Sequence, residues 1–118
     1  MLLIRNKTRG LLLAYKAGIA NTSSLRRRGL LKHEHLSPGD GLWLVPCEAV
    51  HTFGMKFPID VLYLSRAKKV MKIESCLPKR RISLYLRAHS VLELPAGIAA
   101  ATGTAVGDEL TMERVEPA

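Results

Sequence analysis

Residues 43–64 read WLVPCEAVHTFGMKFPIDVLYL, and the fold predicted for the chain is built around this stretch. Residues 42–45 and 59–64 are mainly apolar runs of the length that strands have. Because residues 42–45 are all apolar rather than alternating with polar ones, we expect this strand to be covered on both faces. Gly54 and the Phe57-Pro58 pair interrupt the strand pattern, and residues 50–53 form a third strand-like piece before them.

Outward from this stretch, the chain alternates short strand patterns with turns. Residues 65–68 form a turn that joins residues 59–64 to an alternating strand at residues 69–76, as a hairpin. Further strands are predicted at residues 11–15, 17–20, 91–94 and 109–115, and a tight helical turn is predicted at residues 98–103.

Residues 21–24, NTSS, are four successive N-cap candidates and predict one short helix near residues 23–31. Gly29 either ends this helix early or allows close packing against another backbone. Many short strands with a single short helix predict an all-β fold, mainly antiparallel, of the sandwich or barrel type.

The 118 residues fit a single domain, residues 1–118, with 47% hydrophobic and 24% charged residues. The apolar runs are far shorter than the roughly 20 residues that a membrane-spanning helix needs. Lys16 ends the apolar run 11–15 too early for a signal peptide, so we expect a cytoplasmic protein. Cys47 and Cys76 match no metal or redox spacing, and we expect two reduced, mostly buried thiols.

The net charge of +8 is distributed unevenly along the chain. Residues 1–35 carry +7, residues 36–65 carry −2, residues 66–89 carry +7 and residues 90–118 carry −4. Such asymmetry permits binding of a phosphate-rich partner. The candidates for this contact are two basic triplets, Arg26, Arg27 and Arg28 in the predicted helix, and Lys79, Arg80 and Arg81 in a loop. The alternative is that both triplets are simply solvated.

His51 and Asp60 are the sharpest candidate pair, because a His oriented by a carboxylate serves in acid-base catalysis and in ligand binding. In the alternative interpretation, Asp60 accepts hydrogen bonds from backbone amides near residues 54–56. Apolar walls with a few polar groups are typical of ligand pockets, although the same side chains also suit a core. The predicted ligand-binding residues are Trp43, His51, Thr52, Phe53, Met55 and Asp60.

Cys47 and His51 resemble a thiol nucleophile and its base, but such a pair needs a lowered thiol pKa and an oxyanion pocket. A set drawn from Cys47, His51, Met55 and Asp60 mixes soft and hard metal ligands at an unfamiliar spacing. We therefore expect no metal site and no cofactor. Glu93 stands alone among apolar residues in VLEL, and we expect it to face solvent from an antiparallel sheet.

Several pieces of the chain together resemble a known family. They are RGLL (28–31), GDGLWLVPC (39–47), HTFGMKFPIDVLYL (51–64), VLELPAG (91–97) and GDEL (107–110). In this order they resemble the uncharacterised family called domain of unknown function 192, over about residues 10–112, and the HTFGM and PIDV pieces are the most specific. The resemblance implies a compact, mostly β fold of sandwich type, and it implies no activity, ligand or catalytic residues.

The sequence supports three functional hypotheses. The first is a small binding or interaction module with a polar and aromatic cleft around His51 and Asp60, for a small ligand or a protein partner. The second is a binder of nucleic acid or another anionic partner that uses the two basic triplets. The third is a hydrolase or thiol enzyme that uses His51 with Asp60 or Cys47. The sequence predicts no particular ligand and no oligomeric state.

Overall fold

The structure, a computed structural model, describes residues 1–31 and 33–116, which form nine strands and two short helices. The elements, in chain order, are β1 (Leu2–Asn6), β2 (Leu11–Ala20), α1 (Ser23–Arg28), β3 (Asp40–Leu44), β4 (Ala49–His51), β5 (Ile59–Leu64), β6 (Val70–Leu77), β7 (Ile82–Leu84), β8 (Ser90–Pro95), α2 (Ile98–Thr102) and β9 (Leu110–Arg114). None of the helices in this described part is long and apolar enough to cross a membrane.

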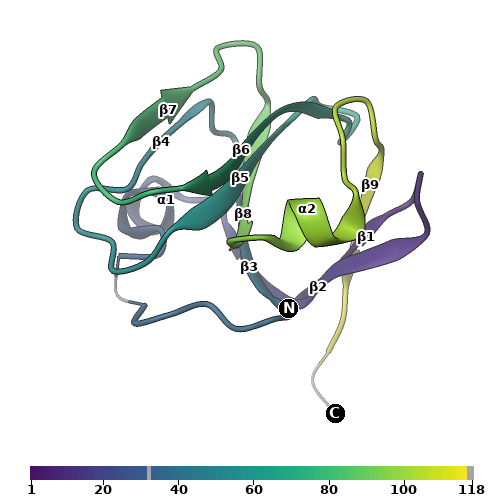
Figure 1. The fold of residues 1–118 in the computed structure, drawn as a ribbon, viewed down its shortest axis with the longest axis horizontal. Coiled ribbons are helices and arrows are strands. Elements are labelled where there is room, and N and C mark those ends of the chain that lie inside the picture. The colour runs from purple at the N-terminus through teal and green to yellow at the C-terminus, as the bar shows by residue number, and fades with distance from the viewer. Residues whose placement is uncertain (32, 117–118) are drawn as a thin grey trace.

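Seven of these strands form one sheet in the order β6-β5-β8-β3-β2-β1-β9 (Figure 1). Neighbouring strands are antiparallel, except for the parallel pair β2 and β3. The sheet curls until its two edges meet at one end, where Lys69 pairs with Glu109. The Val70 amide donates to the Asp108 carbonyl at 2.8 Å, and the Leu110 amide donates to the Lys68 carbonyl at 2.8 Å. The result is an incomplete barrel closed at one end.

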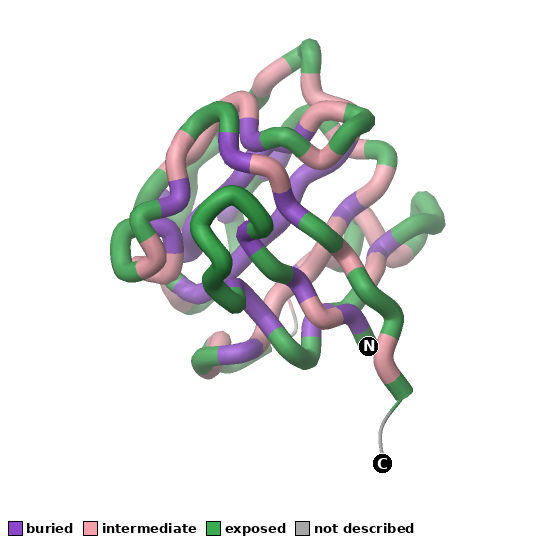
Figure 2. The backbone as a smooth tube through the Cα atoms, turned by 90° about the vertical axis from the view of Figure 1, so that its right-hand side faces the viewer, coloured by how far each residue is buried: buried purple, intermediate pink, exposed green. Residues whose placement is uncertain are grey.

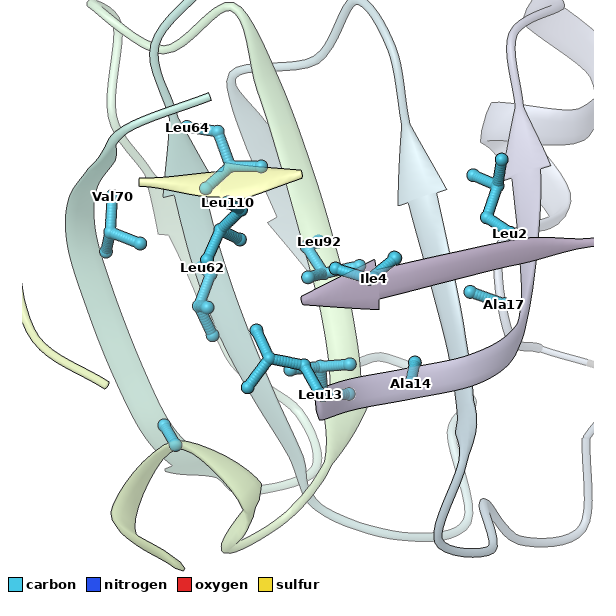
Figure 3. Close-up of a cluster of buried hydrophobic side chains, with 12 residues drawn as sticks. Leu2, Ile4, Leu13, Ala14, Ala17, Leu62, Leu64, Val70, Leu92 and Leu110 are labelled. Atoms are coloured by element: carbon cyan, nitrogen blue, oxygen red, sulfur yellow. The ribbon is translucent and has the colours of Figure 1, made fainter. Parts of the chain in front are cut away.

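The central strands β5 and β8 are buried on both faces, and every residue in them is buried. Side chains that point inside the curl form the barrel core (Figure 3). Its buried members are Leu2, Ile4, Leu13, Ala14, Ala17, Leu62, Leu64, Val70, Leu92, Leu94, Ala99 and Leu110. Figure 2 shows that buried residues run through the middle of the molecule, while exposed residues lie on its outer turns and along parts of its outer strands.

Side chains on the opposite face of the central strands form a second cluster, the outer core. Its buried members are Ala20, Leu30, Leu44, Val50, Met55, Ile59, Val61, Tyr63, Leu77 and Val91. Two elements cover this face: α1 with the residues after it, and the two-stranded sheet of β4 and β7. The Tyr63 hydroxyl donates to the Ser83 hydroxyl at 2.8 Å, which fixes β7 over β5.

The structure confirms the predicted all-β fold and most of its elements, including the hairpin of β5 and β6. The helix begins at Ser23 as predicted but ends at Arg28, because Gly29 takes a positive φ of 49° and caps it. Residues 11–15 and 17–20 form one continuous strand, β2, rather than two. β1 and β7 lie outside the predicted strands, and β7 has only three residues. The two thiols are less buried than expected, since Cys47 is half-buried and Cys76 is exposed.

Candidate functional site

A pocket of about 560 Å³ opens on the outer face of the sheet, between α1 and β4. One wall is Ser23 with residues 26–31, and the other wall is formed by residues between Leu44 and Met55. Glu93, from the middle of β8, lies at the floor. The volume lies within the range of small-molecule sites in proteins.

Glu93 faces the pocket because β8 alternates. Its neighbours Leu92 and Leu94 point into the barrel core, so Glu93 points to the opposite face, between Leu42 on β3 and Val61 on β5. The prediction that Glu93 faces solvent is wrong: the residue is only 4% exposed, because α1 and β4 cover this face of the sheet. The sequence carries a signal for this burial. Val91, which shares a face with Glu93, is apolar, and so are Leu92 and Leu94 on the other face; apolar residues on both faces are typical of a strand covered on both sides.

The carboxyl group of Glu93 is buried, and one of its oxygens lacks a hydrogen-bond partner in the described part of the chain to offset the loss of water. Its Oε1 has no hydrogen-bond partner among the described residues. Burial raises the pKa of this carboxyl group to about 7. Near neutral pH the protonated and the ionised forms are therefore both populated, and the group can either donate or accept a hydrogen bond.

Three arginines of α1 line one wall of the pocket, namely Arg26, Arg27 and Arg28, and the exposed Arg27 and Arg28 lie at its entrance on the solvent side. The Arg26 guanidinium donates from Nη1 to the Val45 carbonyl at 3.3 Å, which holds it between the helix and the end of β3. Within the described part of the chain, none of the three forms an ion pair with a carboxylate. Their positive charge is therefore available to a ligand.

Cys47, His51 and Met55, which belong to the stretch 43–64, line the pocket. The half-buried Cys47 thiol donates to the Ala49 carbonyl at 3.2 Å, and burial raises its pKa. A raised pKa keeps the thiol protonated and argues against a nucleophilic thiolate. Met55 is buried in the outer core, whereas His51 is exposed at the surface end of β4.

Asp60 does not lie in this pocket. The alternation of β5 directs Ile59 and Val61 into the outer core and Asp60 to the opposite side. The fully buried Asp60 carboxylate accepts hydrogen bonds from three backbone amides, those of Cys76 at 2.8 Å, Gly97 at 3.2 Å and Ala99 at 2.8 Å. The structure therefore corrects the predicted cleft of His51 with Asp60, and also the alternative in which amides near residues 54–56 donate to Asp60.

Thr52 and Trp43 also lie outside the pocket. The buried Thr52 hydroxyl donates to the Pro78 carbonyl at 2.7 Å and accepts from the Arg81 amide at 2.8 Å, which joins the end of β4 to the segment before β7. Trp43 packs against the barrel core, with the Lys68 Nζ 5.7 Å from its ring centroid. Both side chains therefore support the fold.

Phe53 lies on the outer surface beside His51, and their ring centroids are 6.1 Å apart. The second basic triplet, Lys79, Arg80 and Arg81, lies in the loop between β6 and β7. The pocket is lined by the first triplet and not by the second. No three His, Cys, Asp or Glu side chains in residues 1–31 and 33–116 gather closely enough to hold a metal ion.

Known proteins share this fold. The chain resembles a protein of unknown function from Novosphingobium aromaticivorans DSM 12444, with a TM-score of 0.80 and 19% identity, over 93% of this chain and 82% of that one. It also resembles a protein from Sinorhizobium meliloti 1021 that is described provisionally as a transcription regulator, with a TM-score of 0.82 and 20% identity, over 94% and 91% of the two chains. At these identities the likeness concerns the fold alone.

The sequence comparisons point to one family. A UPF0127 protein of Thermococcus sibiricus (strain DSM 12597 / MM 739) is 28% identical over 116 residues, which cover 92% of this chain and 73% of the relative. Residues 4–112 match the model of the family DUF192, described as an uncharacterized ACR. The chain belongs to the DUF192 family.

Proposed function

We propose that the protein is a small-molecule-binding module whose ligand occupies the pocket between α1 and β4 and contacts Glu93. The observation that carries this proposal is the Glu93 carboxyl group, which is 4% exposed, has no partner for Oε1 among the described residues, and lies at the floor of an open pocket. Burying a polar group without a hydrogen bond is costly, and such groups are rare in folded proteins. A ligand that supplies the missing hydrogen bond would remove that cost.

The ligand class follows from the charges of the pocket. Arg26, Arg27 and Arg28 in one wall favour a carboxylate or phosphate group, since guanidinium groups bind both through paired hydrogen bonds. Glu93 favours a hydroxyl or amine group at the other end of the same ligand. We therefore propose a small organic anion that carries a hydroxyl or amine group.

The test is a titration of isotope-labelled full-length protein, followed by amide chemical shifts. The probes are glycerol 3-phosphate and malate, which carry both an anionic group and a hydroxyl group. Glycerol has the hydroxyl groups without the anion, and inorganic phosphate is the anion without the organic hydroxyl; these two are the half-compounds. We expect the two hydroxylated anions to shift amides of α1 and residues 47–51 at lower concentration than either half-compound. Equal affinity for all four probes, or no shift at millimolar concentration, would contradict the proposal.

Two variants assign the contacts. Glu93→Gln keeps the size of the side chain and removes the acid, and Arg26→Gln removes a charge from the pocket wall. Each should weaken binding by roughly 10-fold or more, since hydrogen bonds to charged groups are worth about 1.5–3 kcal/mol. Arg114→Gln removes the same charge as Arg26→Gln, at an exposed residue of β9, and is the control that should leave the affinity unchanged.

A second candidate function is binding of nucleic acid through the basic residues. The observation in its favour is that Arg26, Arg27 and Arg28 have no ion-pair partner within the part of the chain that the structure describes. A titration against RNA and DNA at two salt concentrations tests it, because phosphate contacts make affinity fall steeply with salt. Glu93→Gln separates the two candidates, since a phosphate backbone at the protein surface does not need the buried acid.

A further inference from the structure

A second feature of the surface is independent of the Glu93 pocket. Four large apolar side chains are exposed on and beside the sheet of β4 and β7: Phe53 (48%), Leu84 (50%), Ile82 (68%) and Leu86 (69%). We call these four residues the apolar strip. Figure 1 shows β4 and β7 on the side of the molecule away from β1 and β9.

The geometry of β7 explains why the strip faces outward. Ser83 is buried and bonds to Tyr63 beneath it, so its neighbours Ile82 and Leu84 point away from the outer core. Ile82 pairs with His51, and the two residues line a shallow hollow together with Phe53. Leu86 follows in the turn closed by the Ala88 amide and the Tyr85 carbonyl, at 2.9 Å.

Basic residues lie at both ends of the strip. Residues 78–89 contain Lys79, Arg80, Arg81 and Arg87 and no acidic residue. None of these four side chains forms an ion pair with a carboxylate in the ranges 1–31 and 33–116. Glu48, next to β4, is one nearby opposing charge, and Glu74 is another, since its ion-pair partner Lys72 donates to the Leu84 carbonyl at 3.2 Å. The three arginines of α1 lie across β4 from the strip. The whole face is therefore cationic around an apolar centre.

This combination identifies the chemistry of the partner. A second copy of the chain, docked symmetrically, would bring the same cations together, and like charges oppose such a contact. Nucleic acid fits the strip poorly, because bases stack on several aromatic rings, and the strip has only one, Phe53, beside three aliphatic side chains. A planar anionic surface with an apolar interior matches both the apolar strip and the basic residues around it. The apolar side chains enter the boundary between headgroups and acyl chains, while the cations contact the headgroups.

We propose that the apolar strip and its flanking basic residues dock the protein reversibly on a bilayer that contains anionic phospholipids. The strip would place Ile82, Leu84, Leu86 and Phe53 at the boundary between headgroups and acyl chains, with the basic residues around them. The inference does not depend on the proposed ligand pocket, because Glu93 takes no part in it.

The experiment is flotation of the full chain with vesicles of phosphatidylcholine alone and of phosphatidylcholine with 30% phosphatidylglycerol. We expect binding to the anionic vesicles, weaker binding at high salt, and little binding to the neutral vesicles. The double variant Ile82→Ser with Leu86→Ser should lose at least roughly tenfold in affinity, since it removes two apolar contacts with the interface. Both positions are exposed, and unchanged thermal unfolding verifies that this variant is folded.

Charge variants distinguish the docking face from general attraction by the net charge. Lys79→Gln with Arg80→Gln should weaken binding by roughly fivefold for each residue. Lys7→Gln with Arg114→Gln removes the same charge beside β1 and on β9 and should have a much smaller effect. The proposal is overturned if the protein does not bind anionic vesicles, or if it binds only RNA or an acidic apolar peptide instead. It is also overturned if the two charge variants bind equally well, or if the serine variant binds as tightly as wild type.

Discussion

Two buried carboxyl groups lie on adjacent strands but face opposite sides of the sheet. Asp60 on β5 pairs in register with Leu94, and Glu93 on β8 pairs with Val61. The Asp60 carboxylate accepts three backbone hydrogen bonds, whereas Glu93 Oε1 accepts none within the described chain. The first carboxyl group therefore stabilises the fold, and the second is the one available to a ligand.

Replacing Asp60 with Ala should destabilise the protein strongly. The amides of Cys76, Gly97 and Ala99 would lose their acceptor, and we expect the free energy of unfolding to fall by about 3 kcal/mol or more. Urea unfolding measures this loss. Asp60→Asn, which retains one acceptor oxygen, is the matched control and should lose less. Should Asp60→Asn abolish ligand binding while remaining folded, the purely structural role of Asp60 would be refuted.

Glu93 should make stability depend on pH. Its pKa is about 7 in the folded chain, above the ordinary value of 4.5. Below pH 4.5 the carboxyl group is protonated in both folded and unfolded chains. Between pH 4.5 and 7 the unfolded chain releases the proton first, so the free energy of unfolding should fall by about 3 kcal/mol as pH rises.

Glu93→Gln removes this contribution because the amide does not titrate. The difference in unfolding free energy between variant and wild type should therefore move by about 3 kcal/mol in favour of the variant from pH 4.5 to pH 8. Urea unfolding at several pH values gives this difference, and other titrating groups cancel from it. A difference that stays constant with pH would show that the acid is not desolvated in solution.

At the scale of elements, α1 is six residues long and depends on its ends and its packing. The Thr22 hydroxyl accepts from the Leu25 amide at 3.1 Å at the start, and the Gly29 amide donates to the Leu25 carbonyl at 2.9 Å at the end. Leu25 and Leu30 attach the helix to the outer core. The same six residues carry all three arginines of the pocket wall.

Thr22→Ala should loosen α1 and weaken ligand binding together. Loss of an N-cap costs about 1 kcal/mol, and here it also frees Arg26, Arg27 and Arg28 from a fixed position. Urea unfolding and the titration with glycerol 3-phosphate measure the two effects. Thr22→Ser keeps the acceptor oxygen and should behave like wild type. Weaker stability with unchanged binding would mean that the pocket does not use the arginines.

At the scale of the whole molecule, the strand content was predictable from the sequence but the covering of the sheet was not. The apolar runs at residues 42–45, 59–64 and 91–94 correspond to strands β3, β5 and β8. β5 and β8 are buried at every position, whereas β3, which was expected to be covered on both faces, is buried only at Leu44 and half-buried elsewhere. The sequence places Glu93 wrongly, in contact with solvent, because alternation tells which residues share a face of the sheet and not what covers that face. The cover consists of α1 and the three-residue strands β4 and β7, which pair across about 30 residues of sequence.

Asp60 shows the same restriction at long range. Its partners are the amides of Cys76, Gly97 and Ala99, which lie 16, 37 and 39 residues away along the chain. A short-range sequence pattern cannot predict that these amides lie beside Asp60. It does predict that Cys47, His51 and Met55, which are close in sequence, lie together, and they line one wall of the pocket. Local sequence patterns therefore identify part of one wall of the pocket, and they do not identify its floor, Glu93.

The closure of the sheet depends on Asp108, which connects three segments. Its carbonyl accepts from the Val70 amide, and its carboxylate accepts from Asn6 Nδ2 at 2.9 Å, from Arg9 Nε at 2.6 Å and from the Ala105 amide at 3.0 Å. The Arg9 and Asn6 hydrogen bonds lower the pKa of this carboxyl group from 3.8 to about 2. Its stabilising contribution is therefore complete above about pH 4 and is lost as pH falls towards 2.

Asp108→Asn should lower the free energy of unfolding at pH 7 by about 2 kcal/mol, the value of hydrogen bonds to a charged group. The difference from wild type should shrink as pH falls from 4 to 2, because the wild-type carboxylate is then protonated as well. Hydrogen exchange of the Val70 and Leu110 amides should quicken in the variant, since these amides bridge the two edges of the sheet. Glu109→Gln removes the same charge from the adjacent residue, whose ion pair with Lys7 is exposed, and should change stability by less than about 1 kcal/mol. If the two variants were equally unstable, net charge rather than the Asp108 hydrogen bonds would hold the barrel closed.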